Sequence, residues 1–389
     1  MVPTSRNLGV HQGAPNRSSR CWPFADRTGW QLTGHFFRAM FDFGILTQAG
    51  ADSFKHMLLG VAGGVVAVGL LLTRIFIERY GALASAATPE PYRHALLGDD
   101  MLIIGLPMLL LAFITLLASE SLFPDERDFR ILGPLPVRKA VIFGAKMAAL
   151  LFFSGLFIVV AHVALVPMML LTSMNPWREH TPLLRLTAWA VTSVSASAFA
   201  VFAITGIVGV LVLMAPRGRL HLLIALLRST VLAALVLYVP LLLSAPSLGT
   251  SLSSGLGWMA LVPPAWFVGL HRVLVGNVGP WFAYLATIAL AALGVAATTV
   301  AVAYTVLFRH FERLVLRSAT TSPVWPRADA TTALSGATPP FRAVYRFTTA
   351  TLWRSPLHQS VLIGLSACGV GIAINRLSGE DLANWSGAG

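Results

Sequence analysis

The residues of this sequence that could do chemistry are few, and they form no recognisable catalytic set. The three lysines, Lys55, Lys139 and Lys146, are each followed by a residue other than Ser or Thr. A P-loop needs Gly-Lys-Ser/Thr to hold phosphates and magnesium, so this chain is not predicted to hydrolyse ATP by itself. The ten histidines include no pair at a spacing that places two ligands on one helix face, and Cys21 and Cys368 are far apart. The sequence therefore predicts no metal, no disulfide framework and no cofactor held by this chain.

Two isolated candidates lie in apolar stretches. His162 would sit inside a membrane helix, where an ionisable residue suggests function; we favour a neutral histidine that hydrogen-bonds a neighbouring helix. The stretch Gly364-Leu365-Ser366-Ala367 matches the Gly-x-Ser pattern of rhomboid-type intramembrane proteases. No histidine follows it in a later apolar stretch, so we interpret it as small-residue helix packing.

The most informative charged stretch follows the second long apolar run. Proline suits the first turn of a helix, acidic residues suit its positive end and basic residues its negative end, and Gly-Pro prevents continuation. These signals predict a two-turn helix over 124–132 that carries both charge signs and docks another protein; the alternative is a solvated connecting loop. The residues of this predicted docking helix and its exit are Pro124, Asp125, Glu126, Arg127, Asp128, Phe129, Arg130, Gly133 and Pro136.

The elements around this stretch are predicted to be membrane helices. Of the 389 residues, 56% are hydrophobic and 11% are charged, and the mean hydropathy is +0.73. An ordinary soluble domain has about 25% charged residues, so that class is excluded. Six runs are long enough to cross a bilayer, and a seventh is shorter and rich in glycine. The runs are His56 to Ile77, Met101 to Ala118, Met147 to Leu171, Thr187 to Met214, Ser229 to Ala245, Pro280 to Phe308 and, seventh, Ser360 to Asn375.

The distribution of Lys and Arg predicts the orientation. With the N-terminus inside, 21 of these residues fall in inside segments and six in outside segments. Basic residues concentrate in cytoplasmic loops, so we expect the N-terminus inside and an even number of spans before Arg309. The net charge of +12 is then explained by loops that face anionic lipid, and no nucleic-acid partner is expected.

Two further segments are too polar or too broken to span. In Leu32 to Ser53, a helix in the membrane interface would place Phe36, Met40 and Phe43 on one side. Pro246 to Gly279 is apolar but interrupted by Pro263 and Pro264, which favours short helices that dip back into the outer leaflet. The alternative for the first segment is an apolar stretch that merely precedes the span, and the alternative for the second is a packed extracellular cap.

These features together resemble the permease subunit of type-2 ATP-binding-cassette (ABC) exporters. The resemblance covers about residues 32–317. Its motifs are the 124–128 helix start, Leu135-Pro136, Gly144-Ala145-Lys146 and the prolines in Val262-Pro263-Pro264-Ala265-Trp266. Family permeases often stop after the sixth span, whereas this chain continues.

The resemblance implies an all-α integral membrane protein of the bacterial cytoplasmic membrane. Its six-helix bundle would carry a cytoplasmic coupling helix at 124–132, re-entrant helices between spans 5 and 6, and a possible seventh span. The implied partners are a separate ABC ATPase subunit, which would bind ATP and magnesium, a second permease copy and the lipid bilayer. The expected organisation is a disordered segment (1–31), an interfacial helix (32–55), the six-span domain (56–317), a linker (318–359) and the possible seventh span with its tail (360–389).

Other functions remain open from the residues alone. A secondary transporter is disfavoured, because no Asp or Glu lies centrally in any predicted span. A membrane enzyme is disfavoured by the lack of a catalytic constellation. A membrane scaffold without its own chemistry is a further alternative. The sequence does not identify the substrate.

Overall fold

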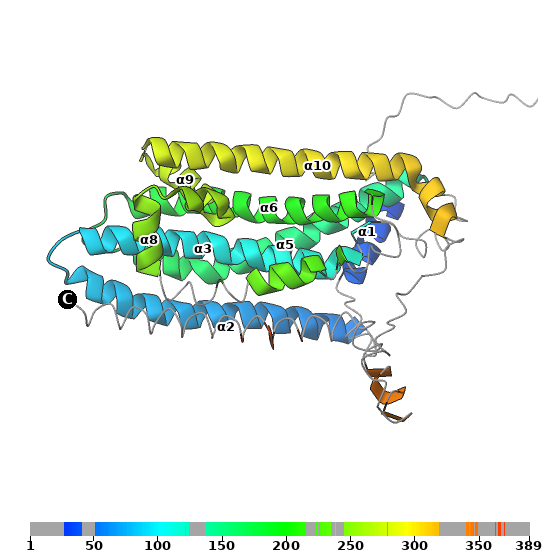
Figure 1. Cartoon of the computed structure of the whole chain (residues 1–389), viewed down its shortest axis with the longest axis horizontal. Helices are drawn as coiled ribbons and strands as arrows, with labels where there is room; N and C mark the ends of the chain where they lie inside the picture. Colours follow the sequence, from blue (N-terminus) through cyan, green and yellow to red (C-terminus); the bar gives the residue numbers. More distant parts are fainter. Residues whose placement is uncertain are drawn as a thin grey trace, which may run out of the picture.

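The computed structural model describes residues 27–40, 51–120, 122–123, 137–214, 245–277 and 279–318, with scattered positions within 223–238 and 340–369. All elements in this part of the chain are helices. Five of them are long and lie side by side; the first four alternate in direction along the chain, and the fifth runs parallel to the fourth (Figure 1). They are α2 (Ala51–Ala84), α3 (Glu90–Leu117), α5 (Lys139–Ser173), α6 (Pro182–Met214) and α10 (Pro280–Ser318).

Four of these helices are long and apolar enough to cross a membrane. They are α3, α5, α6 and the part of α10 from Pro280 to Arg309. A membrane helix satisfies all its backbone hydrogen bonds internally, which is why long apolar runs fold this way. The predicted class of all-α membrane protein is confirmed at this level.

The long helices start earlier than the hydropathy runs predicted. The second run was expected to begin at Met101, but α3 begins at Glu90, after Pro89 and with Pro91 in its first turn. Likewise α5 begins at Lys139 and α6 at Pro182. A hydropathy run ends at the first charged residue. A helix can continue past that residue, because its backbone hydrogen bonds do not depend on the side chain and the charge can be paired with another group. The start of the sixth run at Pro280 is confirmed by α10.

Three predicted spans are not among these four helices. The run from His56 to Ile77 lies within α2, a continuous helix. Most of the runs from Ser229 to Ala245 and from Ser360 to Asn375 lies outside the described residues.

Five short helical elements complete the described fold. At one end of the bundle, α1 (Arg27–Ala39) packs against α5, so the helix begins inside the 1–31 segment that was expected to be disordered. The turn η1 (Ala118–Glu120) extends α3 at the same end. At the opposite end lie α8 (Ala245–Ser253), η2 (Gly257–Leu261) and α9 (Pro263–Val275), with α8 running across the long helices (Figure 1). We call these two ends the α1 end and the α9 end.

The two prolines that interrupt the apolar 246–279 segment begin a helix. Pro263 and Pro264 occupy the first turn of α9, where a missing N–H costs no hydrogen bond. Gly276, in the left-handed region at φ 105°, ends the same helix. The sequence therefore defines α9 as a separate 13-residue unit, which is too short to cross a bilayer.

Close contacts between long helices depend on small residues. A Cβ atom at Gly206 of α6 would lie 3.4 Å from the Cβ of Thr299 in α10, and one at Gly69 of α2 would lie 2.7 Å from the carbonyl oxygen of Ala164 in α5. Within a bilayer, helices associate mainly through close packing, since lipid is as apolar as the side chains. These glycines therefore set how closely the helix pairs approach.

Candidate functional site

The predicted docking helix itself lies outside the described residues, because Pro124 to Pro136 are not among them. The residues on either side of it are described. Leu122 and Phe123 precede it, and Val137 and Arg138 lead into α5. The structure therefore shows how the segment is attached to the bundle.

Phe123 is fixed from several sides at the α1 end. The Lys146 Nζ donates a 2.8 Å hydrogen bond to the Phe123 carbonyl oxygen, and the Tyr304 hydroxyl donates a 2.7 Å hydrogen bond to that of Leu122. The Phe123 and Tyr304 rings lie 4.9 Å apart, centroid to centroid. We call Leu122, Phe123, Lys146 and Tyr304 the Phe123 anchor.

A glycine makes room for the Phe123 ring. A Cβ atom at Gly209 of α6 would lie 3.0 Å from the tip of that ring and 2.8 Å from the Cβ of Ala303 in α10. Phe123 is 6% exposed, which places it inside the bundle rather than on a free loop. The α6–α10 contact thus provides the space that Phe123 occupies.

The helix α1 contacts the same anchor. The Lys146 ammonium lies 5.1 Å from the centroid of the Phe36 ring, within the range of a cation–π contact. Phe36 and Met40, two of the three residues predicted to share a face, are buried, while Phe43 lies outside the described residues. Lys146 is 4% exposed, so this charge is held almost entirely by protein groups.

A second fixing point lies just before the anchor. The Arg228 side chain donates to the Leu116 carbonyl oxygen at 3.2 Å and to the Ser119 hydroxyl at 3.0 Å. These bonds satisfy backbone and side-chain groups where α3 ends. The residues that follow α3 are therefore held in place by contacts with α5, α6, α10 and Arg228.

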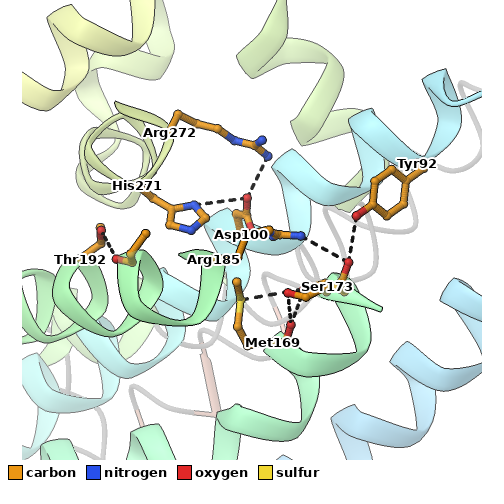
Figure 2. A network of polar contacts seen from close by, with 10 residues as sticks. Tyr92, Asp100, Met169, Ser173, Arg185, Thr192, His271 and Arg272 are labelled. Atoms are coloured by element: carbon orange, nitrogen blue, oxygen red, sulfur yellow. Dashed lines mark hydrogen bonds and ion pairs between the residues drawn. The ribbon is translucent and has the colours of Figure 1, made fainter. Parts of the chain in front are cut away.

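A buried charge cluster lies at the α9 end, centred on Asp100 of α3 (Figure 2). Asp100 Oδ1 accepts a 2.9 Å hydrogen bond from Arg185 of α6, and Oδ2 accepts one of 2.8 Å from Arg272 of α9. The His271 Nδ1 lies 3.5 Å from the same Oδ2. Asp100 and His271 are 2% and 1% exposed. We call Asp100, Arg185, His271 and Arg272 the charge cluster.

Further bonds extend the charge cluster to the neighbouring helices. Arg185 and Tyr92 both donate to the carbonyl oxygen of Thr172, near the end of α5 (Figure 2). Asp99, adjacent to Asp100, accepts a hydrogen bond from Arg79 of α2. Charged groups from α2, α3, α6 and α9 therefore meet at one level of the bundle, which compensates their removal from water.

The charge cluster corrects one expectation from the sequence. Asp99 and Asp100 were placed outside the second run, which was expected to begin at Met101, yet both lie within α3 and are buried. Their partners come from distant parts of the chain, so spacing alone could not reveal them. The available signal was the helix start at Pro91 followed by Ala95, Leu96 and Leu97, which carries an apolar helix through both aspartates.

The arginines assigned to outside segments are largely neutralised. Arg79, Arg185 and Arg272 pair with Asp99 or Asp100, and Arg93 pairs with Glu90 and Glu179. Uncompensated basic residues are therefore fewer at the α9 end than the sequence count of six suggests.

His162 hydrogen-bonds the backbone of its own helix and packs against the neighbouring helix α6. Its Nδ1 lies 2.7 Å from the Ile158 carbonyl oxygen, and its ring lies 5.4 Å from that of Trp189 in α6. The described residues include no group of three His, Cys, Asp or Glu that could hold a metal.

Comparison with known proteins adds no relative from which a role could be transferred. The chain matches no protein-family model, no curated protein and no solved structure.

Proposed function

We propose that this chain is the membrane-spanning permease subunit of an ATP-driven exporter, with ATP hydrolysed by a separate partner chain. The observation that carries the proposal is the Phe123 anchor. A charged segment that is to receive force from a partner needs a rigid base, and this base contacts α1, α5, α6 and α10 together.

The proposed mechanism uses the 124–132 segment as the docking helix for the ATPase. Asp125, Glu126, Arg127, Asp128 and Arg130 would contact a groove of the partner. Two permease copies would pair, each above an ATPase. Closure of the ATPases on ATP would push each docking helix, and the anchor would convert that push into a rigid-body movement of the bundle.

The positions of the basic residues support an orientation with the α1 end in the cytoplasm. Cytoplasmic segments of membrane proteins carry an excess of Lys and Arg. At the α9 end, acidic partners neutralise Arg79, Arg93, Arg185 and Arg272. The docking helix would then face the compartment that contains ATP.

A secondary transporter is the second candidate, because Asp99 and Asp100 lie inside a membrane helix. Acidic residues at such positions often carry protons or sodium. Here Asp99 is paired with Arg79, and Asp100 with two arginines. Carboxylates whose charge is already compensated by protein arginines are poor sites for a transported cation, so the first candidate is favoured.

The test is affinity purification of the tagged full chain from its native membrane in mild detergent, followed by mass spectrometry. We expect a stoichiometric P-loop ATPase and ATP hydrolysis in the eluate. Reversing charge in Arg127→Glu/Arg130→Glu should remove the ATPase while the chain still inserts. The matched control, Arg313→Glu/Arg317→Glu in α10, makes the same charge change outside the segment and should retain it.

Two results would contradict the proposal. The first is a preparation without any ATPase, repeated after cross-linking in the intact membrane. The second is normal ATPase recovery with Arg127→Glu/Arg130→Glu, which would exclude the docking role of the segment.

A further inference from the structure

The charge cluster connects helices of very different size. Asp100 belongs to α3 and Arg185 to α6, and both helices are long enough to cross a membrane. His271 and Arg272 belong to the last turn of α9, a 13-residue helix with its own start and stop signals. α9 is the short one of the three helices, and it also packs closely on α10, where Gly269 lies directly against Leu285 and Ala286. Opening at this site would therefore move α9 together with the start of α10, away from Asp100 of α3.

The rest of the α9 contact is apolar. Phe267 and Val268 are fully buried, and the rings of Phe267 and Phe199 in α6 lie 5.6 Å apart. Val268 and Arg272 are four residues apart, so they lie on the same side of α9. This side is the one that closes over α3 and α6.

Two polar atoms of the cluster, the Nε of Arg272 and the Nε2 of His271, are buried and lack a hydrogen-bond partner in the described part of the chain. The His271 Nδ1 has its 3.5 Å contact with Asp100 Oδ2. A buried polar group without a partner is costly, and a buried ion pair is often no more stable than apolar residues of similar size. Stability alone therefore does not explain why charges hold α9 here.

We propose that the charge cluster is a reversible closure of the α9 end: Arg272 and His271 hold α9 on Asp100 in the closed state and separate from it when that end opens. In the open state water would solvate Arg272 and His271, whereas Asp100 would keep Arg185. The two carboxylate oxygens divide these roles, because Oδ1 faces Arg185 of α6 and Oδ2 faces α9. The purpose of the opening rests on the proposed transport function, but the closure itself does not.

The test measures the accessibility of a thiol beneath α9. The background is the full chain with Cys21→Ser and Cys368→Ser, which removes both native cysteines. Val268→Cys is the reporter, because Val268 is fully buried on the cluster side of α9. Ser154→Cys, at a buried position of α5, is the control reporter for general loosening of the bundle. Both are labelled with a membrane-impermeant maleimide in vesicles of either orientation.

Removing the α9 arginine should open the closure selectively. We expect Arg272→Gln to raise the labelling rate of the Val268→Cys thiol at least about tenfold, which corresponds to about 1.4 kcal/mol in the opening equilibrium. The Ser154→Cys thiol should be unaffected. Arg93→Gln is the matched control, because it removes an exposed arginine ion pair at the same end, and it should leave both rates unchanged.

A double-mutant cycle separates a closure from simple destabilisation. Asp100→Asn and Arg272→Gln act on the same contact, so the double variant should label Val268→Cys no faster than the faster single variant. Three results would each overturn the proposal. The first is additive effects of the two substitutions on the labelling rate of Val268→Cys. The others are an equal rise in the labelling rate of Ser154→Cys and no rise at Val268→Cys in folded Arg272→Gln protein.

A final measurement distinguishes this proposal from the proposed function. If the purified complex contains an ATPase, ATP should accelerate labelling of the Val268→Cys thiol with the charge cluster intact. Acceleration by Arg272→Gln in a chain that binds no ATPase would support the closure and contradict the exporter proposal. An ATPase complex whose Val268→Cys labelling is independent of ATP would contradict the closure and leave the exporter proposal standing.

Discussion

The Lys146 ammonium joins two segments that are distant in sequence: it donates a hydrogen bond to the Phe123 carbonyl oxygen and lies over the Phe36 ring. One buried charge therefore connects the helix α1 with the start of the predicted docking segment. A movement of either segment changes the surroundings of the same ammonium group. This relationship makes the Phe123 anchor the first target for mutation.

Replacing Lys146 should weaken the anchor. Lys146→Met keeps the length of the side chain but leaves the buried Phe123 carbonyl without its donor, which costs about 1–3 kcal/mol. We expect a lower melting temperature in detergent and faster proteolysis within 124–136. Lys139→Met, at an exposed position in the first turn of the same helix, is the control. Equal protease resistance of the Lys146→Met and parent chains would contradict the role of Lys146 in the anchor.

Removing the Tyr304 hydroxyl should have a smaller effect. Tyr304→Phe retains the ring packed on Phe123 and loses one hydrogen bond to Leu122, worth about 1 kcal/mol. The melting temperature of the purified chain, measured without denaturant, reports this change. Tyr284→Phe, whose side chain is 52% exposed in the same helix, should melt like the parent. A Tyr304→Phe melt identical to the parent would show that this bond does not stabilise the exit from α3.

Adding a methyl group at Gly209 should displace the Phe123 ring. Gly209→Ala places a Cβ within 2.8 Å of that of Ala303 and 3.0 Å of Phe123, and such overpacking costs about 1–3 kcal/mol. Gly155→Ala is the matched control, because nothing lies within 4 Å of a Cβ there. We expect Gly155→Ala to melt at the same temperature as the parent and Gly209→Ala to melt at a lower one. Equal melting temperatures for Gly209→Ala and the parent would contradict the close contact.

The contact between α6 and α10 predicts a specific cross-link. In a chain without native cysteines, Gly206→Cys/Thr299→Cys brings together two Cβ atoms whose positions are 3.4 Å apart, close to the usual disulfide range of about 3.5–4.5 Å. Mild oxidation should close this bond, as seen by a gel shift after protease cleavage between the helices. Gly206→Cys/Gly294→Cys should not cross-link, since a Cβ at Gly294 meets no neighbouring atom.

The charge cluster should tolerate substitution less well than the exposed ion pair nearby. Arg185→Gln leaves the buried Asp100 with one arginine fewer, and breaking a buried pair costs about 3–5 kcal/mol. Arg93→Gln breaks exposed pairs with Glu90 and Glu179 and should melt close to the parent. Melting curves of the two variants in the same detergent make the comparison, and equal losses would mean that burial of the cluster does not matter.

The sequence predicted the helices better than it predicted their polar contacts. Pro280, Pro263 and Gly276 act through local backbone chemistry, so the limits of α9 and the start of α10 can be predicted from the residues themselves. The position of Asp100 could not be predicted in this way. Burial removes its carboxylate from water, and the free-energy cost is offset by Arg185 and Arg272, which are distant in sequence. Lys146 was recognised as part of a motif, but its contact with Phe36 depends on how α1 packs against α5.

The predicted docking residues stay a prediction. Pro124 to Pro136 lie outside the described residues, and the structure bears on them through Phe123, where the segment begins. Charge reversal at Arg127 and Arg130 is therefore the direct test of that segment, whereas the Lys146 and Gly209 variants test its base.

The two adjacent aspartates of α3 also imply an order of assembly during synthesis. Asp99 finds Arg79 in the preceding helix, so the α2–α3 hairpin already contains both members of that pair when it leaves the ribosome. Asp100 depends on Arg185 and Arg272, which are synthesised much later. Until α6 arrives, α3 carries a carboxylate that neither apolar neighbours nor lipid can solvate well. Early insertion intermediates should therefore hold the N-terminal part of α3 near the membrane surface, and the helix should reach its final depth after α6 has been made.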